Sequence, residues 1–375
     1  MRRGSVVLAA ALAQRPGVGG HTWFALQYLL GFRALGWEVT LVDRLDPGMP
    51  GDGLAYLAEE MERFGLGGCW SVLLPGGESA GLPRAEVERR VGSSDFLLNV
   101  MGYLDDEDLL ARAPLRVFLD VDPGFGQMWR ELGLADPFAG HERFVSVGLN
   151  LGSAGCEVPD CGLEWIPTLP PVALAHWPAA EGGDAFTSVA TWRGPYGPVE
   201  YEGRTYGLRV HEFRRFLSLP ERVSAKFELA LAIDPGDAAD LERLRRANWG
   251  LVEPDAVADP GSYRSFIQAS AAEFTVAKAM YVETRGGWFS DRSACYLASG
   301  KPVVAQETGF GGHLPTGRGL LAFSTMEEAA AAVEEVRCGR ERHARAAREI
   351  AEEHLDAQRV LGRLVEELGA VRTHV

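Results

Sequence analysis

Apolar runs alternate with amphipathic stretches along most of the chain. Residues 5–13 (SVVLAAALA) form an apolar run that leads into a glycine-rich loop at 14–20. An amphipathic stretch at 21–35 and a second apolar run at 38–42 follow. Strand, helix and strand in this succession predict a βαβ unit of the doubly wound kind.

The same alternation continues to residue 368 and is interrupted once. Prolines crowd the stretch 167–178, a composition typical of a linker. We therefore predict an α/β fold with two Rossmann-like doubly wound domains facing across a cleft. The boundaries are 1–178, 185–340 and a closing helical segment at 341–375 that packs back on the first domain. The predicted strands are 5–13, 38–42, 70–74, 96–100, 116–121, 144–147 and 163–166, then 188–191, 226–233, 251–252, 272–275 and 303–305; the later helices are 209–217, 238–248, 262–269, 326–336 and 341–368.

Composition narrows the class of protein. The chain has 375 residues, 46% hydrophobic and 24% charged, which is typical of globular domains. A net charge of −15 argues against a nucleic-acid partner, because phosphate backbones need a basic surface. Five scattered cysteines favour the reducing cytoplasm; Cys156 and Cys161 fit either two free thiols or a local disulfide.

The N-terminus imitates a signal peptide, with two arginines before an apolar run. We interpret residues 5–13 as the first strand instead, because they lead directly into the glycine loop and helix. No other apolar run in the sequence is long enough to span a membrane.

The segment 286–309 (GGWFSDRSACYLASGKPVVAQETG) carries the strongest functional signal. A glycine turn enters a helix that Ser290 or Asp291 can cap, and Gly300 and Pro302 end it. Such a helix N-terminus offers free N–H groups and a positive dipole end to a diphosphate. The strand at 303–305 then ends in a polar loop, where open α/β sheets bind ligands.

These features resemble the GT-B glycosyltransferases, particularly bacterial members of glycosyltransferase families 1 and 4. The segment 286–309 is similar to their donor-binding segment, residues 287–290 (GWFS) to a G-W-N-S signature, and residues 17–21 (GVGGH) to their first glycine loop. Retaining members often carry two glutamates where this chain has Gly287 and Cys295, so their absence favours an inverting mechanism. Arg285 stands where related enzymes place a phosphate-binding histidine.

The resemblance implies specific roles. His21 opens the first helix at the cleft and is the expected base that removes the acceptor proton; the alternative is a capping or packing histidine. Asp120 and Asp122 are at the end of a predicted central strand, where a buried carboxylate can orient His21 and stabilise its charged form; the alternative is an Asp-Pro-Gly turn. Their D-x-D spacing also matches a metal motif of GT-A enzymes, but the two-lobe layout argues against a metal. The expected donor-binding residues are Gly19, Gly20, Trp192, Arg193, Arg285, Gly287, Ser290, Asp291, Arg292, Ser293, Glu307 and Thr308.

The sequence therefore predicts a glycosyltransferase of the hexosyltransferase type that uses UDP- or TDP-sugar, without a metal or other cofactor. Its expected partners are a nucleotide sugar and an acceptor; base, sugar, acceptor and oligomeric state stay open. The alternatives are a GT-B-like sugar-nucleotide 2-epimerase, which needs no acceptor, and a non-catalytic two-lobed binding protein.

Overall fold

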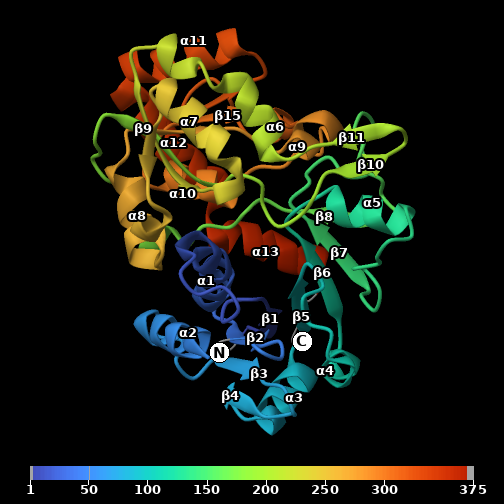
Figure 1. Cartoon of the computed structure of the whole chain (residues 1–375). Helices are drawn as coiled ribbons and strands as arrows, with labels where there is room; N and C mark the ends of the chain where they lie inside the picture. The colour runs from blue at the N-terminus through green and yellow to red at the C-terminus, as the bar shows by residue number, and fades with distance from the viewer. Residues whose placement is uncertain (1–2, 50, 370–375) are drawn as a thin grey trace.

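The computed structural model describes residues 3–49 and 51–369. Figure 1 shows two α/β lobes, the N-terminal one in blue to teal below and the C-terminal one in yellow to red above. Residues 1–2 and 370–375, the ends of the predicted first and closing segments, and residue 50 lie outside the described residues.

The first lobe is built on an eight-stranded sheet with the order β4-β3-β2-β1-β5-β6-β7-β8. Neighbouring strands are parallel except β4, which is antiparallel to β3. The chain winds outward from β1 in both directions, so the β1/β5 boundary is the switch point where such folds bind ligands. The strands are β1 (Ser5–Ala9), β2 (Glu38–Arg44), β3 (Trp70–Leu73), β4 (Ser79–Gly81), β5 (Phe96–Val100), β6 (Arg116–Asp120), β7 (Arg143–Ser146) and β8 (Trp165–Pro167).

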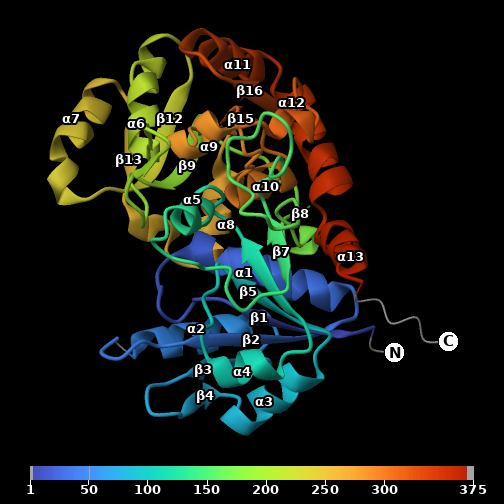
Figure 2. The same ribbon diagram turned by 90° about the vertical axis from the view of Figure 1, so that its right-hand side faces the viewer.

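Both faces of this sheet are covered by helices. Alternate β1 residues point to opposite sides: Val6 and Leu8 join the core under α1, whereas Val7 and Ala9 join the core under α3 and α4. Figure 2 shows α1 on one side of the sheet and α3 and α4 on the other. The helices are α1 (Gly19–Ala34), α2 (Asp52–Arg63), α3 (Arg84–Ser93), α4 (Glu107–Arg112) and α5 (Phe125–Glu131).

The second lobe repeats this winding with six parallel strands in the order β13-β12-β9-β14-β15-β16. Its switch point lies between β9 and β14, and a hairpin, β10 and β11, is inserted after β9. The strands are β9 (Ala185–Thr191), β10 (Val199–Tyr201), β11 (Arg204–Tyr206), β12 (Lys226–Ala232), β13 (Gly250–Val252), β14 (Ala272–Thr275), β15 (Val303–Gln306) and β16 (Leu320–Phe323). Two doubly wound sheets confirm the predicted fold class.

Eight helices are described in this half, and the last of them returns to the first lobe. They are α6 (Arg209–Phe213), α7 (Ala238–Arg246), α8 (Pro260–Ala269), α9 (Ala279–Thr284), α10 (Asp291–Ala298), α11 (Met326–Cys338), α12 (Arg340–Ile350) and α13 (Ala357–Glu367). The single helix predicted at 341–368 is instead broken: a π-helical turn at Ala351–Leu355 ends at Asp356, which leaves helical geometry and caps α13.

Helix α13 packs against α1 at a glycine. A Cβ atom on Gly31 would lie 2.6 Å from Leu361 Cδ1 and 2.7 Å from the Cβ of Ala357, so only glycine permits this approach. Beside this contact, Val172 of the interlobe segment pairs with the backbone of Leu355 and Ala357. Figure 1 shows α13 between the lobes. A single apolar core therefore runs from α1 through α13 into α10.

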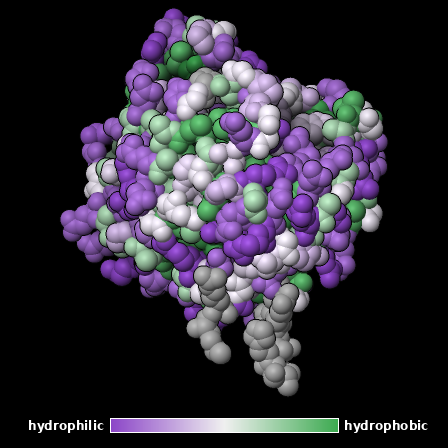
Figure 3. All heavy atoms as spheres, turned by 90° about the horizontal axis from the view of Figure 1, so that it is seen from below, coloured by the Kyte–Doolittle hydropathy of each residue, from purple (hydrophilic) through white to green (hydrophobic). Residues whose placement is uncertain are grey.

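The apolar side chains are largely internal. The face seen from below in Figure 3 is mostly hydrophilic, with small scattered apolar patches.

All five cysteines are free thiols, so Cys156 and Cys161 form no disulfide. None of the helices within residues 3–49 and 51–369 is both long and apolar enough to cross a membrane.

Candidate functional site

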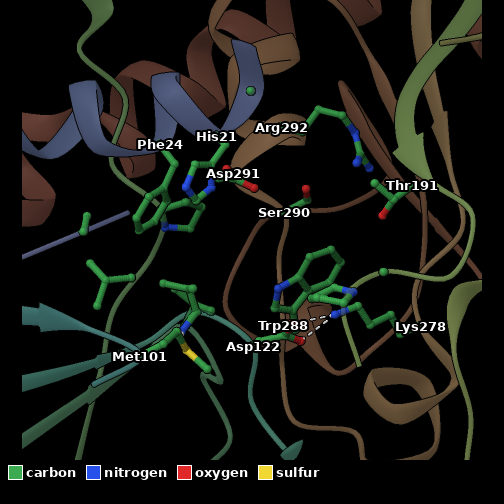
Figure 4. A pocket seen from close by; sticks show the side chains of 18 of the residues that line it. His21, Phe24, Met101, Asp122, Thr191, Lys278, Trp288, Ser290, Asp291 and Arg292 are labelled. Carbon is green, nitrogen blue, oxygen red and sulfur yellow. Dashed lines mark hydrogen bonds and ion pairs between the residues drawn. The ribbon is translucent and has the colours of Figure 1, made fainter. Parts of the chain in front are cut away.

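A cavity of about 540 Å³ lies between the two lobes and is called the interlobe cavity below. Segments that follow the carboxyl ends of β1, β5 and β6 line it from the first lobe. The loop after β9 and the N-terminus of α10 line it from the second (Figure 4). Both switch points therefore open toward this space, as expected for ligand sites in doubly wound folds.

The glycine turn before α10 is required by its surroundings. Gly287 has φ +79°, and a Cβ atom there would lie 3.0 Å from the backbone nitrogen of Asn150. The turn delivers Ser290, Asp291 and Arg292 to the cavity wall. Ser290 makes no side-chain cap, and the Asp291 carboxylate lies next to the backbone N–H groups of Asp291 and Arg292 at the start of α10.

Ser293 lies away from the interlobe cavity. It lines a small separate hollow next to Thr275 and Gln306. Its hydroxyl is buried without a hydrogen-bond partner among the described residues. Only its backbone N–H belongs to the helix N-terminus, so its predicted donor-binding role is reduced to that group.

Arg292 is occupied by protein groups. Its Nε lies 2.5 Å from Glu273 Oε1, its Nη1 donates to the Val189 carbonyl, and its Nη2 donates to Thr275 Oγ1. Burial alone would lower the pKa of Arg292, but the ion pair with Glu273 raises it. The sequence-based expectation of a free phosphate ligand needs correction: this arginine ties α10 to β9 and β14.

Arg209, which the sequence did not single out, is an unpaired cation of the site. It lines the interlobe cavity at the start of α6. Its Nε has no hydrogen-bond partner in the described part of the chain. Burial, together with the charge of Arg292, lowers its pKa to about 10. Tyr281, Glu273 and Asp122 oppose this shift, but none of them forms an ion pair or hydrogen bond with the guanidinium, which therefore favours an anionic ligand beside it.

Arg15 is a second basic residue that the sequence did not identify. It lies on the exposed loop after β1 and lines both the interlobe cavity and a second hollow of about 790 Å³. Within residues 3–49 and 51–369, no side chain forms an ion pair or hydrogen bond with its guanidinium. The second hollow lies at the ends of β12 and β13, so Arg15 faces the second lobe across the cleft.

Lys278 and Asp122 connect the lobes at the other end of the cavity. Lys278 Nζ lies 2.7 Å from both carboxylate oxygens of Asp122, and Tyr281 also donates to this carboxylate. The ammonium lies over the rings of Phe125 and Tyr281. Burial lowers the pKa of Lys278, and the ion pair opposes this. Figure 4 shows this pair with dashed lines, apart from His21.

His21 lines the cavity, as do Gly20 and Asp291. Its Nε2 is hydrogen-bonded to the carbonyl of Ala11, and a carbonyl only accepts, so Nε2 carries the hydrogen. Nδ1 is then free to accept a proton. Burial lowers the pKa of His21, and the charge of Arg15 acts in the same direction.

Asp291 and His21 face each other from different lobes, as Figure 4 shows. The Asp291 side chain is exposed at the cavity wall but surrounded by protein on its other sides, which raises its pKa. The positive charge that His21 can carry opposes this shift.

Asp120 does not have the place expected for a residue that orients His21. It is buried, and its carboxylate accepts hydrogen bonds from Gln127 Nε2 and Ser146 Oγ, each at 2.8 Å. Burial raises its pKa to about 6. Asp120 instead fixes the loop between β6 and α5.

Two residues of the segment after β9 line the second hollow and not the interlobe cavity. Most of the Trp192 side chain is buried in the second lobe's core, where its indole donates to Asp240. Arg193 pairs with Asp237 at 2.5 Å and lines the second hollow.

The remaining predicted donor residues have structural partners. Arg285 ends α9 with φ 52°, and its carbonyl accepts from Asn150. Glu307 accepts from the N–H groups of Gly309 and Gly311, and Thr308 donates to the Trp288 carbonyl. Gly19 packs against the backbone before α8. The described residues that line the interlobe cavity do not include these four.

The described residues include no group of three or more His, Cys, Asp or Glu placed to hold a metal ion. The D-x-D pair is divided between two roles, because Asp120 is internal and Asp122 is paired with Lys278.

The fold matches solved glycosyltransferases over nearly its whole length. One is an alpha-glucosyltransferase in complex with UDP and a 13-mer DNA, with 13% identity, TM-score 0.63, and coverage of 98% of this chain and 100% of that chain. Anabaena Alr3699/HepE in complex with UDP and glucose has 12% identity, TM-score 0.58 and coverage of 98% and 100%. AviGT4, involved in avilamycin A biosynthesis, has 14% identity, TM-score 0.56 and coverage of 98% of both chains. No protein-family model matches the sequence. No curated protein sequence matches it either.

These similarities confirm the resemblance to GT-B glycosyltransferases at the level of the fold. They also correct one prediction. The exclusion of nucleic acid from the net charge of −15 is wrong, because several structures with this fold are complexes with DNA. Net charge is a sum over the whole chain, whereas an acceptor is bound by a local surface.

Proposed function

We propose that the protein transfers a sugar from a nucleoside-diphosphate sugar to an acceptor hydroxyl in the interlobe cavity. The observation that carries this proposal is the unpaired Arg209 guanidinium in the same cavity wall as the N-terminus of α10. Together they form a site for a diphosphate, because the N–H groups at a helix N-terminus and a guanidinium both bind phosphate oxygens.

The second hollow gives the donor a place for its nucleoside. It adjoins the interlobe cavity through four shared lining residues, including Arg15 and Thr191. In the proposed arrangement the nucleoside occupies this hollow, the diphosphate lies between Arg209 and residues 290–292, and the sugar enters the interlobe cavity. The UDP complexes of the similar structures favour uridine, with TDP as the alternative.

The proposed reaction inverts the anomeric centre and uses no metal ion. Nδ1 of His21 removes the acceptor proton while the acceptor oxygen forms a bond to the anomeric carbon. The bond from that carbon to the β-phosphate oxygen breaks, and its electron pair stays on the released nucleoside diphosphate. Arg209, Arg15 and the α10 dipole stabilise the developing charge.

This arrangement of the two substrates assigns a role to each predicted domain. Residues 1–178 hold the acceptor and His21, residues 185–340 hold the donor, and residues 341–375 connect back to the first lobe. The contact between α13 and α1 supports this last assignment.

A ligand screen tests the proposal. Melting temperatures are measured with UDP, TDP, GDP and their sugars, because a ligand that binds only the folded state raises them. A nucleoside diphosphate that raises the melting temperature, followed by transfer of labelled sugar from its nucleotide sugar, supports the function. A protein that binds none of them contradicts it.

An epimerase is the second candidate, since two carboxylates, Asp122 and Asp291, line the cavity. Incubation with the nucleotide sugar alone, followed by NMR of the sugar, separates the two. An epimerised donor without acceptor favours this alternative, and binding without any turnover favours a non-catalytic binding protein.

A further inference from the structure

One part of the first-lobe wall of the interlobe cavity is apolar. Phe24 from α1 contributes a ring, and the other residues follow or end strands β5, β6 and β7. This acceptor wall consists of Phe24, Val100, Met101, Val121 and Val147. Saccharides carry hydroxyl groups on most of their surface, and such a wall offers them few hydrogen bonds.

Tyr28 places one polar atom beside this wall. It lies one turn along α1 from Phe24, with the two ring centroids 5.2 Å apart, and it is among the residues that line the cavity. The side chain is 1% exposed, and its hydroxyl has no hydrogen-bond partner among the described residues. A buried hydroxyl without a partner is unfavourable for folding. Its presence is explained if a bound molecule completes the hydrogen bond.

Met101 shows that the wall is held in an unfavourable backbone conformation. It follows β5 with φ 54°, a left-handed conformation that residues other than glycine rarely adopt. Its sulfur accepts a hydrogen bond from the Val121 N–H at 3.2 Å, which joins two residues of the wall. Thioether sulfurs and aromatic side chains make favourable contacts with aromatic rings.

The charged and titratable side chains of the cavity are not part of the acceptor wall: Asp291 is at the start of α10, and His21 is in the first turn of α1. Asp122 is paired with Lys278, and Arg209 and Arg15 lie at the side toward the second lobe and the second hollow. The Tyr103 hydroxyl donates to Asp43, so the first-lobe wall contributes apolar surface and the unpaired Tyr28 hydroxyl.

We propose, on the basis of the proposed transferase function, that the acceptor hydroxyl is carried by an uncharged, unsaturated planar ring with apolar faces. The ring packs against Phe24 and Met101, and Tyr28 hydrogen-bonds to a polar substituent of the ring. A small phenol or a modified base turned out of a nucleic-acid strand presents the same chemistry, and the test distinguishes these sources.

The test compares four acceptors with the nucleotide sugar that the ligand screen selects. They are 4-methylumbelliferone, 5-hydroxymethyl-2′-deoxyuridine, a 13-mer DNA that contains hydroxymethyluracil, and free glucose. Transfer to 4-methylumbelliferone, to the nucleoside or to the DNA at a kcat/KM at least about tenfold above that for glucose supports the proposal. The relative rates of the free compounds and the DNA identify the source. Transfer to glucose at an equal or higher rate overturns the proposal and leaves the transferase function intact, whereas failure to bind any nucleotide overturns both.

Tyr28→Phe tests the positioning role. We expect the acceptor KM to rise about fivefold, within the range for one hydrogen bond, while the Kd of the nucleoside diphosphate stays unchanged. The melting temperature should not fall, because the removed hydroxyl has no partner. Tyr201→Phe, on the hairpin outside the cavity, is the matched control. Met101→Gln, which adds an amide to the wall, should also reduce kcat/KM for ring acceptors. Unchanged acceptor kinetics in both cavity variants would overturn the assignment of this wall.

Discussion

Replacing Arg209 by glutamine is the sharpest test of the diphosphate site. The guanidinium is surrounded by protein and lacks an ion-pair partner among the described residues, so it destabilises the empty protein. The same charge should attract the donor. Arg209→Gln should therefore make the empty protein more stable and its complex with a nucleoside diphosphate weaker.

The magnitude follows from the pKa of Arg209, which burial lowers from 12.5 to about 10. A shift of one unit corresponds to about 1.4 kcal/mol, so charging this group costs the folded state up to about 3 kcal/mol. The penalty is fully present below pH 10, where both states are protonated, and it disappears as pH rises from 10 to 12.5, where the folded state loses its proton first. Glutamine is also polar, so we expect a gain of about 1 kcal/mol, or about 2–4 °C in melting temperature. A hydrogen bond to a charged group contributes about 1.5–3 kcal/mol, which predicts a Kd about 10 to 150 times higher.

Calorimetry with the nucleoside diphosphate and thermal unfolding without it measure both effects on one preparation. Arg359→Gln, an exposed position on α13, is the control for loss of a surface arginine. Arg209→Lys keeps the charge and should bind more tightly than Arg209→Gln. A glutamine variant with wild-type affinity and a lower melting temperature would refute the reasoning, because Arg209 would then be a structural residue.

Three further substitutions test other parts of the site. His21→Ala should lower kcat by about 10²- to 10⁴-fold and leave donor affinity unchanged. Burial lowers the pKa of His21, so the rate of the wild-type enzyme should fall only on the acid side of pH 6.5. A decline that begins above this pH would argue against His21 as the base. Arg292→Gln leaves the buried Glu273 carboxylate unpaired and should cost about 3–5 kcal/mol in urea unfolding, while an unchanged midpoint would show that the pair is dispensable. Asp122→Asn should release Lys278 for the donor, so calorimetry should show tighter nucleoside diphosphate binding, and weaker binding would place Asp122 in the donor site itself.

Much of the fold could be predicted from the sequence because parallel strands are buried on both faces and read as apolar runs. Residues 96–100 and 116–121 gave strands β5 and β6 within one residue. The short hairpin of β10 and β11 and the edge strand β4 were missed, because three-residue strands are too short to show a period. Strand order is a tertiary property and has no signal in any single run.

The functional site could be predicted only in part from the sequence. The glycine turn and capping residues located the N-terminus of α10, and Ser290 and Asp291 indeed line the cavity. Side-chain direction was not evident: Thr191 lines the cavity, whereas its neighbour Trp192 points into the core, as successive residues of an extended chain do. Lys278 could have been found, since it closely follows the strand predicted at 272–275, where carboxyl-end loops carry ligands.

The close contact at Gly31 has a consequence for how the protein is made. The surface of α1 that receives Leu361 and Ala357 is synthesised more than 300 residues before its partner helix. On the ribosome, the N-terminal lobe can assemble its sheet while an apolar strip of α1 remains open to water or to a chaperone. The chain therefore completes its first lobe only when α13 emerges. A premature stop codon before α13 would leave this surface of α1 uncovered.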